Sequence, residues 1–513
     1  MAMLAPEISR RERIRTDLMR RSPALDLGTI SLQRRSGRSL HLQVADAIRN
    51  GILTGRLRPG ARLPSTRLLA AELNVSRNTT SAAFEQLHSE GFLVSVVGSG
   101  TRVTTAIPKD FIGNVRGDDA AENAMDSGPH PLSQKAAPIA NFLDTRSNSR
   151  PRPFMSGMPA IDQFPFGQWT ALVSRHWRAA TVSDLCSPNP SSGVELRRAI
   201  AAHVGSSRGC SGDESRILVL SGAQQGLDLT ARILSDPGDI CWIEEPGYLG
   251  ARYALSMAGL RLMPAPVDQA GINIELAIAT LPPPRLIYVT PSHQYPLGGT
   301  LPIERRVALL QYAKRVGAWI IEDDYDSEDA YVRDPVPCLL GLDPSDRVIY
   351  IGSFNKTMFP GLRLGFVLAP PEVLPAFKAA RMYVDGHPPA VIQGVMAEFI
   401  ESGAFVSHIR QMRNEYSKRR NILIDALREQ LPELDLGVHD RGLHFVAYLP
   451  DDFNDRKCVA LVEKEGLALT PLSRFYINPA TRQGLVLGFA CVVPHEIEGA
   501  VKSLARALKP VLS

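Results

Sequence analysis

A lysine that directly follows an apolar strand is the residue of this sequence with the clearest chemical potential. Lys356 lies in GSFNKTMFPGLRLGF, which begins right after the strand-like run RVIYI. Burial lowers the pKa of an amine and makes it a usable nucleophile, so this lysine could form a Schiff base with an aldehyde. Ser353 and Arg363 are close enough along the chain to bind one phosphate dianion together. A lone lysine is more often a surface residue, so the assignment depends on the segments around it.

A second motif, AWIIEDDYDSED, is an apolar strand that ends in carboxylates. Asp323 at this strand end could pair with the protonated nitrogen of a pyridine ring and keep the ring electron-withdrawing, and Tyr325 could donate to a phenolate oxygen on the same ring. The alternative is a solvated acidic loop. That alternative suits the outer residues Asp326, Glu328 and Asp329, but not an Asp-x-Tyr that emerges directly from an apolar strand.

Three further segments could surround such a ring, although each alone is weak evidence. RILVLSGAQQGLDL is a strand, a tight glycine turn and a helix, and the backbone N–H groups of Ala223 and Gln224 at the helix start could bind an anion. Tyr248 follows another strand in EEPGY, and YVTPSHQYPLGG ends a strand with Pro, His and two glycines. All three could instead be ordinary turns at the ends of strands.

These residues need a sheet to bring them together, and the second part of the chain predicts one. From about residue 149 to the end, short apolar runs alternate with helical patterns. This alternation predicts an α/β domain with a mainly parallel sheet flanked by helices and a smaller C-terminal α/β part. The apolar runs are RILVLSG, ICWIEE, RLIYVTP, AWIIEDD and RVIYIGS.

Residues 38–105 combine helical periods with turn signals. A first helix begins near Leu40, and Ser65 and Ser76 are suited to cap a second and a third helix. RLRPGARLPS breaks the chain between the first two helices, and FLVSVVGSGTRVTT contains two β-rich runs that favour a hairpin. This order predicts a winged helix-turn-helix.

The start of the third helix carries polar residues that suit contact with DNA. In a helix-turn-helix, the N-terminal end of the recognition helix enters the major groove. Arg77 and Asn78 could reach base edges there, whereas Ser76 and Thr79 could bind phosphate. Many small three-helix modules bind proteins instead, so the charge distribution is needed to decide.

The distribution of charge along the chain favours DNA over a protein as the binding partner of residues 38–105. Residues 1–103 contain 16 Lys and Arg against 8 Asp and Glu, a balance of +8, whereas the rest of the chain has a balance of −4. Arg67 on the second helix could meet the DNA backbone. Gly98 and Gly100 in the wing would allow a close approach, and Arg102 would add charge.

The motifs of both parts resemble known families. L-x-P-G-x-x-L-P-S-x-R-x-L-A at residues 57–70, V-S-R-N-T at 75–79 and the G-x-G wing resemble the GntR-type winged helix. Five motifs in order resemble a fold-type I aminotransferase: the S-G-x-Q turn, the P-x-Y segment, the N-P-x-x-P-x-G loop, the D-x-Y strand end and the S-x-x-K lysine. A GntR head fused to such a body resembles the MocR/GabR family of bacterial regulators.

This resemblance implies pyridoxal 5'-phosphate as the cofactor and a role for each residue around its ring. Lys356 would hold the cofactor as a Schiff base, Asp323 would pair with the ring nitrogen, and Tyr325 would contact the ring oxygen. Tyr248 would cover the ring.

The resemblance also implies residues for the phosphate and for an effector. Ser353, Arg363 and the turn at Ala223 and Gln224 would hold the phosphate. Arg474, in SRFY, lies where the family places the arginine that grips an effector's carboxylate.

Two departures from the family pattern bear on the ligand. The loop that supplies an Asn before Pro in aminotransferases contains Gln294, Tyr295 and Pro296 here, so its contact with the ring oxygen is not implied. A GABA-responsive member has an arginine two residues after the P-G-Y tyrosine. Here that position is Gly250, and Arg252 follows two residues later, which speaks against a GABA-like effector.

Composition excludes several classes of protein. The chain of 513 residues, with 44% hydrophobic and 21% charged residues, can bury a large core, so wholesale disorder is excluded. No apolar stretch reaches the roughly 18 residues of a membrane helix, and the N-terminus lacks the apolar run of a signal peptide. Six widely spaced cysteines without a C-x-x-C pair argue against a disulfide scaffold or a metal site. We therefore expect a cytoplasmic protein that binds no metal.

Four regions are predicted: a basic flexible arm at 1–37, the DNA-binding head at 38–105, a flexible linker at 106–148 and the cofactor-binding body at 149–513. The leading hypothesis is a transcription regulator that binds a double-stranded DNA operator and senses a small amino compound, or the cofactor itself. The resemblance implies a homodimer. The alternatives are a working aminotransferase whose head only targets it, and a regulator with an inactive body. Retention of the Lys356 site residues speaks against the inactive body.

Overall fold

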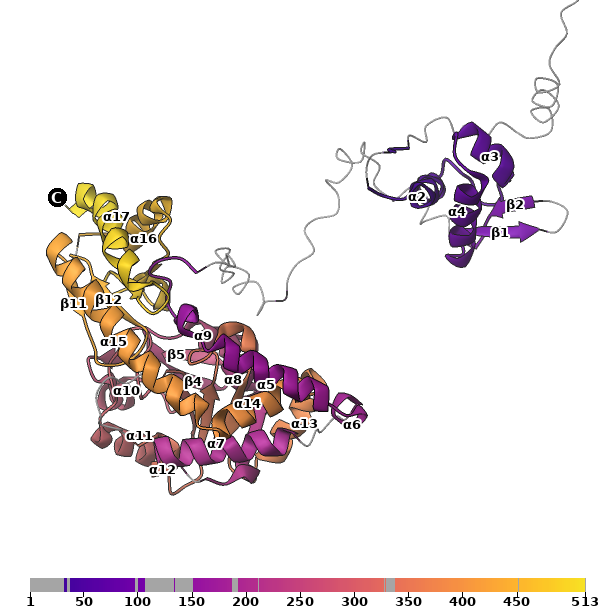
Figure 1. Cartoon of the computed structure of the whole chain (residues 1–513). Coiled ribbons are helices and arrows are strands. Elements are labelled where there is room, and N and C mark those ends of the chain that lie inside the picture. Colours follow the sequence, from indigo (N-terminus) through magenta and orange to yellow (C-terminus); the bar gives the residue numbers. More distant parts are fainter. Residues whose placement is uncertain are drawn as a thin grey trace, which may run out of the picture. The chain divides into compact units, whose positions relative to one another are not determined.

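The computed structural model divides the chain into two compact units, Met1–Pro131 and Leu132–Ser513, which are described separately (Figure 1). The expected arm and linker lie largely outside the described residues, as does Gly98 of the expected wing. The structure describes residues 32–34, 37–96, 100–106, 133, 151–186, 192–210, 212–326, 328, 337–450 and 452–512.

The first unit contains the three predicted helices followed by the predicted hairpin. They are α2 (Leu40–Leu53), α3 (Thr66–Glu72), α4 (Arg77–Ser89), β1 (Leu93–Val96) and β2 (Gly100–Val103). Both predicted caps are present, because Ser65 Oγ accepts a hydrogen bond from the Leu68 amide at 3.3 Å and Ser76 Oγ accepts one from the Thr79 amide at 3.1 Å. Val44, Ile48 and Phe84 lie in one apolar core between the helices and the hairpin.

The hairpin has an additional partner that the sequence did not indicate. The two strands pair antiparallel, with Leu93 opposite Val103. The segment RLRPGARLPS was expected only to interrupt the chain, but it lies along β2. The Leu63 amide donates to Thr101 O and the Val103 amide donates to Ala61 O, both at 2.9 Å. This pairing fixes the base of the wing against the helices.

The second unit is built on an eight-stranded, mainly parallel sheet, as expected. The five predicted apolar runs all form strands in it. The neighbouring pairs β5–β4, β4–β7, β7–β8 and β8–β9 are parallel. The strand β10 is antiparallel to both of its neighbours, β3 and β9, and β6 is antiparallel to β5. In sheet order the strands are β3 (Ile217–Leu220), β10 (Gly365–Leu368), β9 (Val348–Ser353), β8 (Trp319–Asp324), β7 (Leu286–Val289), β4 (Ile240–Glu245), β5 (Arg261–Asp268) and β6 (Gly271–Ile272).

Alternating residues of the strands bury both faces of this sheet. In β4, Ile243 packs in a cluster with residues of α8, α9 and α13, whereas Trp242 packs in another cluster with residues of α10 and α11. Both faces are therefore apolar, as parallel sheets require. The helices are α5 (Phe166–Ala179), α6 (Val182–Cys186), α7 (Ser192–Arg208), α8 (Ala223–Leu234), α9 (Leu249–Met257), α10 (Ile274–Thr280), α11 (Ile303–Val316), α12 (Leu339–Leu342), α13 (Leu374–Val384) and α14 (Ala390–Glu401).

The end of the chain forms the predicted smaller α/β part, drawn in orange and yellow in Figure 1. Its four antiparallel strands are, in order, β11 (Asp435–Gly437), β12 (His444–Tyr448), β14 (Gly484–Gly488) and β13 (Thr470–Pro471). They share a core with the helices α15 (Ala404–Gln430), α16 (Asp455–Val462) and α17 (Pro494–Leu512). Phe154 also lies in this core, so the start of the body packs against its end.

No single described helix is long and apolar enough to cross a membrane; α14 and α15 meet that criterion only together, across a bend of 73°. The cysteine spacing argued against a disulfide scaffold, but it did not indicate the one bridge that the structure contains. Cys210 and Cys338, which are 128 positions apart, are joined by a disulfide, and the other four cysteines are free.

Candidate functional site

A cavity of about 240 Å³ lies at the carboxyl ends of β8 and β9. All eight residues that the sequence assigned to cofactor binding line it, although they come from segments spread over 140 positions. They are Ala223, Gln224, Tyr248, Asp323, Tyr325, Ser353, Lys356 and Arg363. The carboxyl ends of neighbouring parallel strands meet at one edge of a sheet, which explains this convergence.

The amine of Lys356 lies inside the cavity and is held from a distant part of the chain. Its Nζ donates to the backbone oxygen of Gly157 at 2.8 Å. Gly157 has φ +74°, and a side chain there would overlap the lysine Nζ, so a glycine is needed at this close approach. Burial lowers the pKa of Lys356 against the opposing charges of Asp326 and Asp323. A buried amine with a lowered pKa is the state that suits a nucleophile.

Asp323 presents one carboxylate oxygen without a partner. The Tyr288 hydroxyl donates to Asp323 Oδ2 at 2.8 Å, whereas the buried Oδ1 has no hydrogen-bond partner among the residues that the structure describes. Burial raises the pKa of Asp323 to about 7, even though the Tyr288 hydrogen bond opposes this change. A buried acceptor without a partner is costly. A cationic N–H donor in the cavity would satisfy it and favour the ionised carboxylate.

Groups that could bind an anion also line the cavity. The helix α8 begins there, after Gly222 at φ +126°, and its first N–H groups belong to Ala223 and Gln224. Ser353 ends β9, and Arg363 adopts left-handed backbone angles (φ 52°, ψ 48°), which are rare for a residue with a side chain. Strain of this kind is found where a side chain must be held in a required direction. A helix N-terminus beside a guanidinium suits a phosphate.

Gly250, which stands where a GABA-responsive family member has an arginine, lies in crowded surroundings. A Cβ at Gly250 would come within 2.5 Å of the Tyr248 ring and would also overlap Gln224 Oε1. The Gln224 amide group donates to Gly250 O at 2.8 Å, which keeps these residues together. Arg252 donates to Tyr476 O at 3.2 Å and does not line the cavity. Arg252 therefore binds the backbone at Tyr476 and is not one of the residues that line the cavity.

The loop of Gln294, Tyr295 and Pro296, which lacks the Asn that aminotransferases have before Pro, uses its glutamine within the protein. Gln294 is fully buried, and its amide group donates to Pro246 O at 2.9 Å and to Tyr295 O at 2.8 Å. Tyr295 lines the cavity instead, with its ring 5.7 Å from that of Tyr248 and 5.8 Å from that of Tyr325. Sequence reasoning missed Tyr295, as well as Asn355 and His444, which also line the cavity.

Arg474 does not line the cavity itself. It lies in the short helix Leu472–Phe475 of the smaller α/β part, and its charge acts on Tyr295, which does line the cavity. The segment that follows it is attached to the large sheet, because Glu245 accepts hydrogen bonds from the Ile477 and Asn478 amides, each at 2.8 Å. Arg474 is thus close to one wall of the cavity.

The outer acidic residues of the β8 motif were expected in a solvated loop, and this expectation is wrong for two of them. Asp326 and Glu328 have side chains only 2% and 18% exposed, and Asp329 lies outside the described residues. Asp326 Oδ2 lies 2.7 Å from His293 Nδ1. Glu328 Oε1 lies 2.7 Å from His203 Nε2.

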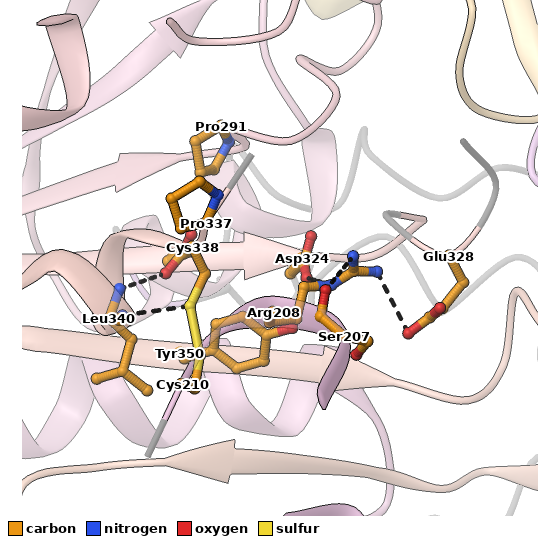
Figure 2. A network of polar contacts seen from close by, with 12 residues as sticks. Ser207, Arg208, Cys210, Pro291, Asp324, Glu328, Pro337, Cys338, Leu340 and Tyr350 are labelled. Carbon is orange, nitrogen blue, oxygen red and sulfur yellow. Dashed lines mark hydrogen bonds and ion pairs between the residues drawn. A yellow bond between two sulfur atoms is a disulfide. The ribbon is translucent and has the colours of Figure 1, made fainter. Parts of the chain in front are cut away.

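A buried arginine joins Glu328 and a further carboxylate, Asp324, into one network (Figure 2). Arg208 Nε lies 3.1 Å from Asp324 Oδ2, and its Nη2 lies 3.2 Å from Glu328 Oε1. The Tyr350 hydroxyl also donates to Asp324 Oδ2. Because Asp324 directly follows Asp323, this network fixes the end of β8 beneath the cavity. The Cys210–Cys338 disulfide lies beside it, and Cys210 follows Arg208 closely in the chain (Figure 2).

The first unit presents its predicted DNA-contacting residues at the surface. Arg67, Arg77 and Asn78 are exposed. The Ser76 hydroxyl is 2.8 Å from the Thr79 hydroxyl and caps α4, so these two side chains hold each other at the helix start. Their hydroxyl groups are therefore partly used within the protein.

The wing residues are tied to their own unit. Arg102 donates to Gly60 O at 3.0 Å, and so it also fixes the wing. A Cβ at Gly100 would meet Arg62 Nε at 3.3 Å. Sequence reasoning missed Arg62, an exposed arginine that lies beside Gly100 of the wing. The pairing of RLRPGARLPS with β2 brings it there.

Comparisons with known proteins match the two units of the chain to two different families. Residues 40–103 match the family of bacterial regulatory proteins called the gntR family, and residues 163–504 match the aminotransferase class I and II family. The probable rhizopine catabolism regulatory protein MocR of Rhizobium meliloti is 38% identical over 91% of this chain and 93% of its own length. The HTH-type transcriptional regulator TauR of Rhodobacter capsulatus is 32% identical over 92% and 97%.

Solved structures match the body. The α-aminoadipate aminotransferase LysN of Thermus thermophilus, in complex with N-(5'-phosphopyridoxyl)-L-leucine, has a TM-score of 0.65 and 28% identity. The match covers 70% of this chain and 92% of that one. The unit that carries the cavity therefore has an aminotransferase fold.

Proposed function

Because the chain belongs to the MocR/GabR-type regulators, in which a GntR winged helix-turn-helix is joined to an aminotransferase class I and II domain, we propose a specific division of labour for it. The head binds an operator in double-stranded DNA, and the body binds pyridoxal 5'-phosphate and senses a small amino compound. The observation that carries the proposal is the convergence of all eight expected residues on one cavity.

The residues around the cavity fit pyridoxal 5'-phosphate. The unpartnered Asp323 Oδ1 offers an acceptor for a protonated ring nitrogen, and the half-buried Lys356 offers an amine. Ser353, Arg363 and the first N–H groups of α8 offer an anion site. When bound, this cofactor supplies an aldehyde that bonds to amines and a ring that withdraws electrons.

The protein's own side chains would then orient and shield the ring. Tyr248, Tyr295 and Tyr325 are aromatic residues that line the cavity. Tyr288 holds Asp323 by its other oxygen, so that Oδ1 alone remains for the ring nitrogen. Burial of the site strengthens each of these contacts because water is excluded.

An effector changes DNA binding only if it has different affinities for two states of the protein. The effector would be an amino compound that reaches the cofactor, or the cofactor itself. Two copies of the chain would act as a homodimer, which suits two DNA half-sites. We place this function in the cytoplasm, where a regulator of this family meets DNA.

The proposal is tested by a screen of amino acids and amines against protein loaded with pyridoxal 5'-phosphate. Visible absorbance and thermal unfolding report binding, and operator DNA binding reports the response. At least one amino compound is expected to change all three. Durable release of a keto acid over many turnovers would favour an enzyme instead, and a body that takes up no cofactor would refute the proposal.

The DNA-binding role predicts different effects for two exposed arginines. Arg77→Ala is expected to weaken binding to the operator by about 1–3 kcal/mol with little effect on random duplex, because Arg77 would read a base edge. Arg67→Ala is expected to weaken both duplexes alike, because it would contact phosphate. Fluorescence titration with both duplexes measures this. Equal losses for Arg77→Ala on the two duplexes would remove it from base reading.

The effector role predicts that Arg474→Ala leaves the cofactor bound but weakens the response to an effector with a carboxylate. Loss of a charge-assisted pair of hydrogen bonds costs roughly 1.5–3 kcal/mol, or roughly a tenfold to hundredfold loss of affinity. Titration of the effector while following operator binding measures this.

Arg482→Ala is the matched control, since Arg482 is an exposed arginine of the same α/β part that pairs with Asp435 at 3.1 Å. An unchanged midpoint in Arg474→Ala would refute the carboxylate grip and favour the free cofactor as effector. Loss of cofactor and stability together would instead assign Arg474 a structural role.

A further inference from the structure

The segment between α2 and α3 lies along the wing and carries an arginine there. Arg62 forms an antiparallel bridge with Arg102 of β2. The backbone hydrogen bonds that join this segment to β2 come from the residues on both sides of that bridge. The segment therefore acts as a third strand beside the hairpin, and Arg62 has a fixed place in it.

Arg62 lies on the face of this small sheet that is turned to solvent. Residues directly opposite each other on antiparallel strands share a face of the sheet, and Arg102 stands opposite both Arg62 and Val94. Val94 is 43% exposed, and Val96, two positions further along the same face, is 44% exposed. Leu93 belongs to the opposite face and is buried in the core. The outer face thus carries Arg62, which is itself exposed.

The guanidinium group of Arg62 lies over the first residue of β2, Gly100. A Cβ at Gly100 would meet Arg62 Nε at 3.3 Å, Nη2 at 3.5 Å and Cζ at 3.8 Å. Gly100 also has φ +85°, a conformation that favours glycine. Because Gly100 and Arg102 are two positions apart, they lie on one face of β2. The Arg62 side chain therefore runs along the outer face toward the start of β2.

The positive charge of Arg62 is not compensated within the described part of the chain. Arg62 makes no ion pair and no side-chain hydrogen bond with any residue that the structure describes. Other arginines of the head differ in this respect. Arg38 lies 2.5 Å from Asp46 Oδ2, and Arg49 Nη2 lies 2.7 Å from Glu90 Oε2. The carboxylates near α2 thus neutralise the arginines around them, but they do not reach the wing.

Two features indicate that the partner of Arg62 is an anion outside the protein. Like charges directly opposite each other across two strands are destabilising, and Arg62 stands opposite Arg102. An anion bound at this face would relieve that repulsion. The chain then continues to Ser65, which caps α3, and to the exposed Arg67. Arg62 therefore lies between the wing and the start of α3, where the proposed function puts DNA.

We propose that Arg62 binds the phosphate backbone of DNA. Together with Gly100 and Arg67 it extends the contact of the head from the start of α3 to the wing. The inference rests on the proposed function of the head and adds to it a contact from the segment between the two helices. A phosphate contact fixes the position of the head on the duplex and carries no sequence information.

The test is the salt dependence of binding to a fluorescently labelled duplex of arbitrary sequence, measured with the full-length protein. Each phosphate contact that is lost makes the plot of log affinity against log salt concentration less steep by about 1. Arg62→Gln, which removes the charge, is expected to weaken binding and to reduce the slope by this amount. Arg62→Lys, which keeps the charge, is expected to keep the slope of the parent.

Two further variants separate the charge of Arg62 from its packing. Arg62→Met keeps an apolar stem that can cover Gly100, and it is expected to reduce the slope as Arg62→Gln does. Arg38→Gln is the matched control, because it removes an exposed arginine of the same unit whose charge Asp46 already neutralises. It is expected to leave the slope unchanged. Thermal unfolding of each variant shows that the measured protein is folded.

Two outcomes would overturn the inference while leaving the DNA-binding role of the head intact. One is a slope in Arg62→Gln and Arg62→Met equal to that of the parent. The other is an equal reduction in Arg62→Lys and Arg62→Gln, which would mean that the shape of the side chain matters and its charge does not. A parent protein that binds no duplex at any salt concentration would instead refute the proposed function of the head, and this inference with it.

Discussion

Lys356→Ala is expected to abolish the covalent attachment of pyridoxal 5'-phosphate completely. The parent protein, incubated with the cofactor and reduced with borohydride, should carry the added mass on the peptide that contains Lys356. The reason is geometric, since Lys356 presents its amine to the cavity, which Asp323 and the anion-binding groups also line. Mass spectrometry of the reduced and digested protein measures the attachment.

Lys378→Ala is the control for this experiment, because Lys378 is an exposed lysine on α13 that does not line the cavity. It should leave both the visible absorbance of the bound cofactor and the labelled peptide unchanged. A labelled peptide that contains another lysine in the Lys356→Ala variant would show that the assignment of the attachment site is wrong.

Arg208→Met is expected to destabilise the body by about 3–5 kcal/mol, because it leaves Asp324 buried without its cation and removes one of the two arginines that face Glu328. The Arg208 side chain is only 9% exposed, and that of Asp324 is fully buried. Chemical denaturation of parent and variant, followed by a signal from the body alone, measures the change. A variant within about 1 kcal/mol of the parent would contradict the importance of the network.

The same network predicts a pH dependence. Burial opposes ionisation of Glu328, but the charge of Arg208 and the contact with His203 outweigh it and lower the pKa of Glu328 to about 2. The folded protein therefore keeps Glu328 ionised where the unfolded chain takes up a proton. Stability from this group is complete above about pH 4.5 and is lost as the pH falls toward 2. Arg208→Met should weaken this dependence.

Arg175→Met is the matched control for both measurements. Arg175 pairs with Glu398 at the surface, where the two side chains are 60% and 37% exposed. Exposed ion pairs contribute about 0–1 kcal/mol, so this variant should unfold close to the parent at every pH.

The sequence was sufficient for five strands of the large sheet and for the residues that follow them directly. Asp323, Ser353 and Lys356 lie at or just beyond strands whose apolar runs are unmistakable, and parallel strands bring their carboxyl ends together. The same reasoning placed α8 and its first residues at the cavity. The helix caps of the head, Ser65 and Ser76, were predictable because capping is a local interaction.

The residues that sequence reasoning missed depend on contacts between distant segments. Gly157 meets Lys356 across 199 positions, and nothing in the sequence around either residue marks the pair. Glu328 was assigned to a solvated loop because its local sequence is acidic, but Arg208, 120 positions earlier, makes its burial tolerable. A local pattern reports whether a side chain prefers water, and it does not report the partner that overrides the preference.

The crowding at Gly250 also limits how the protein can change over generations. Any side chain introduced there would have to displace the Tyr248 ring or the Gln224 amide, because its first carbon would come within 2.5 Å of both. Both of these residues line the cavity. A change of residue at this turn would therefore alter the lining of the cavity along with it, so a new ligand contact and a new cavity shape would arise in the same step.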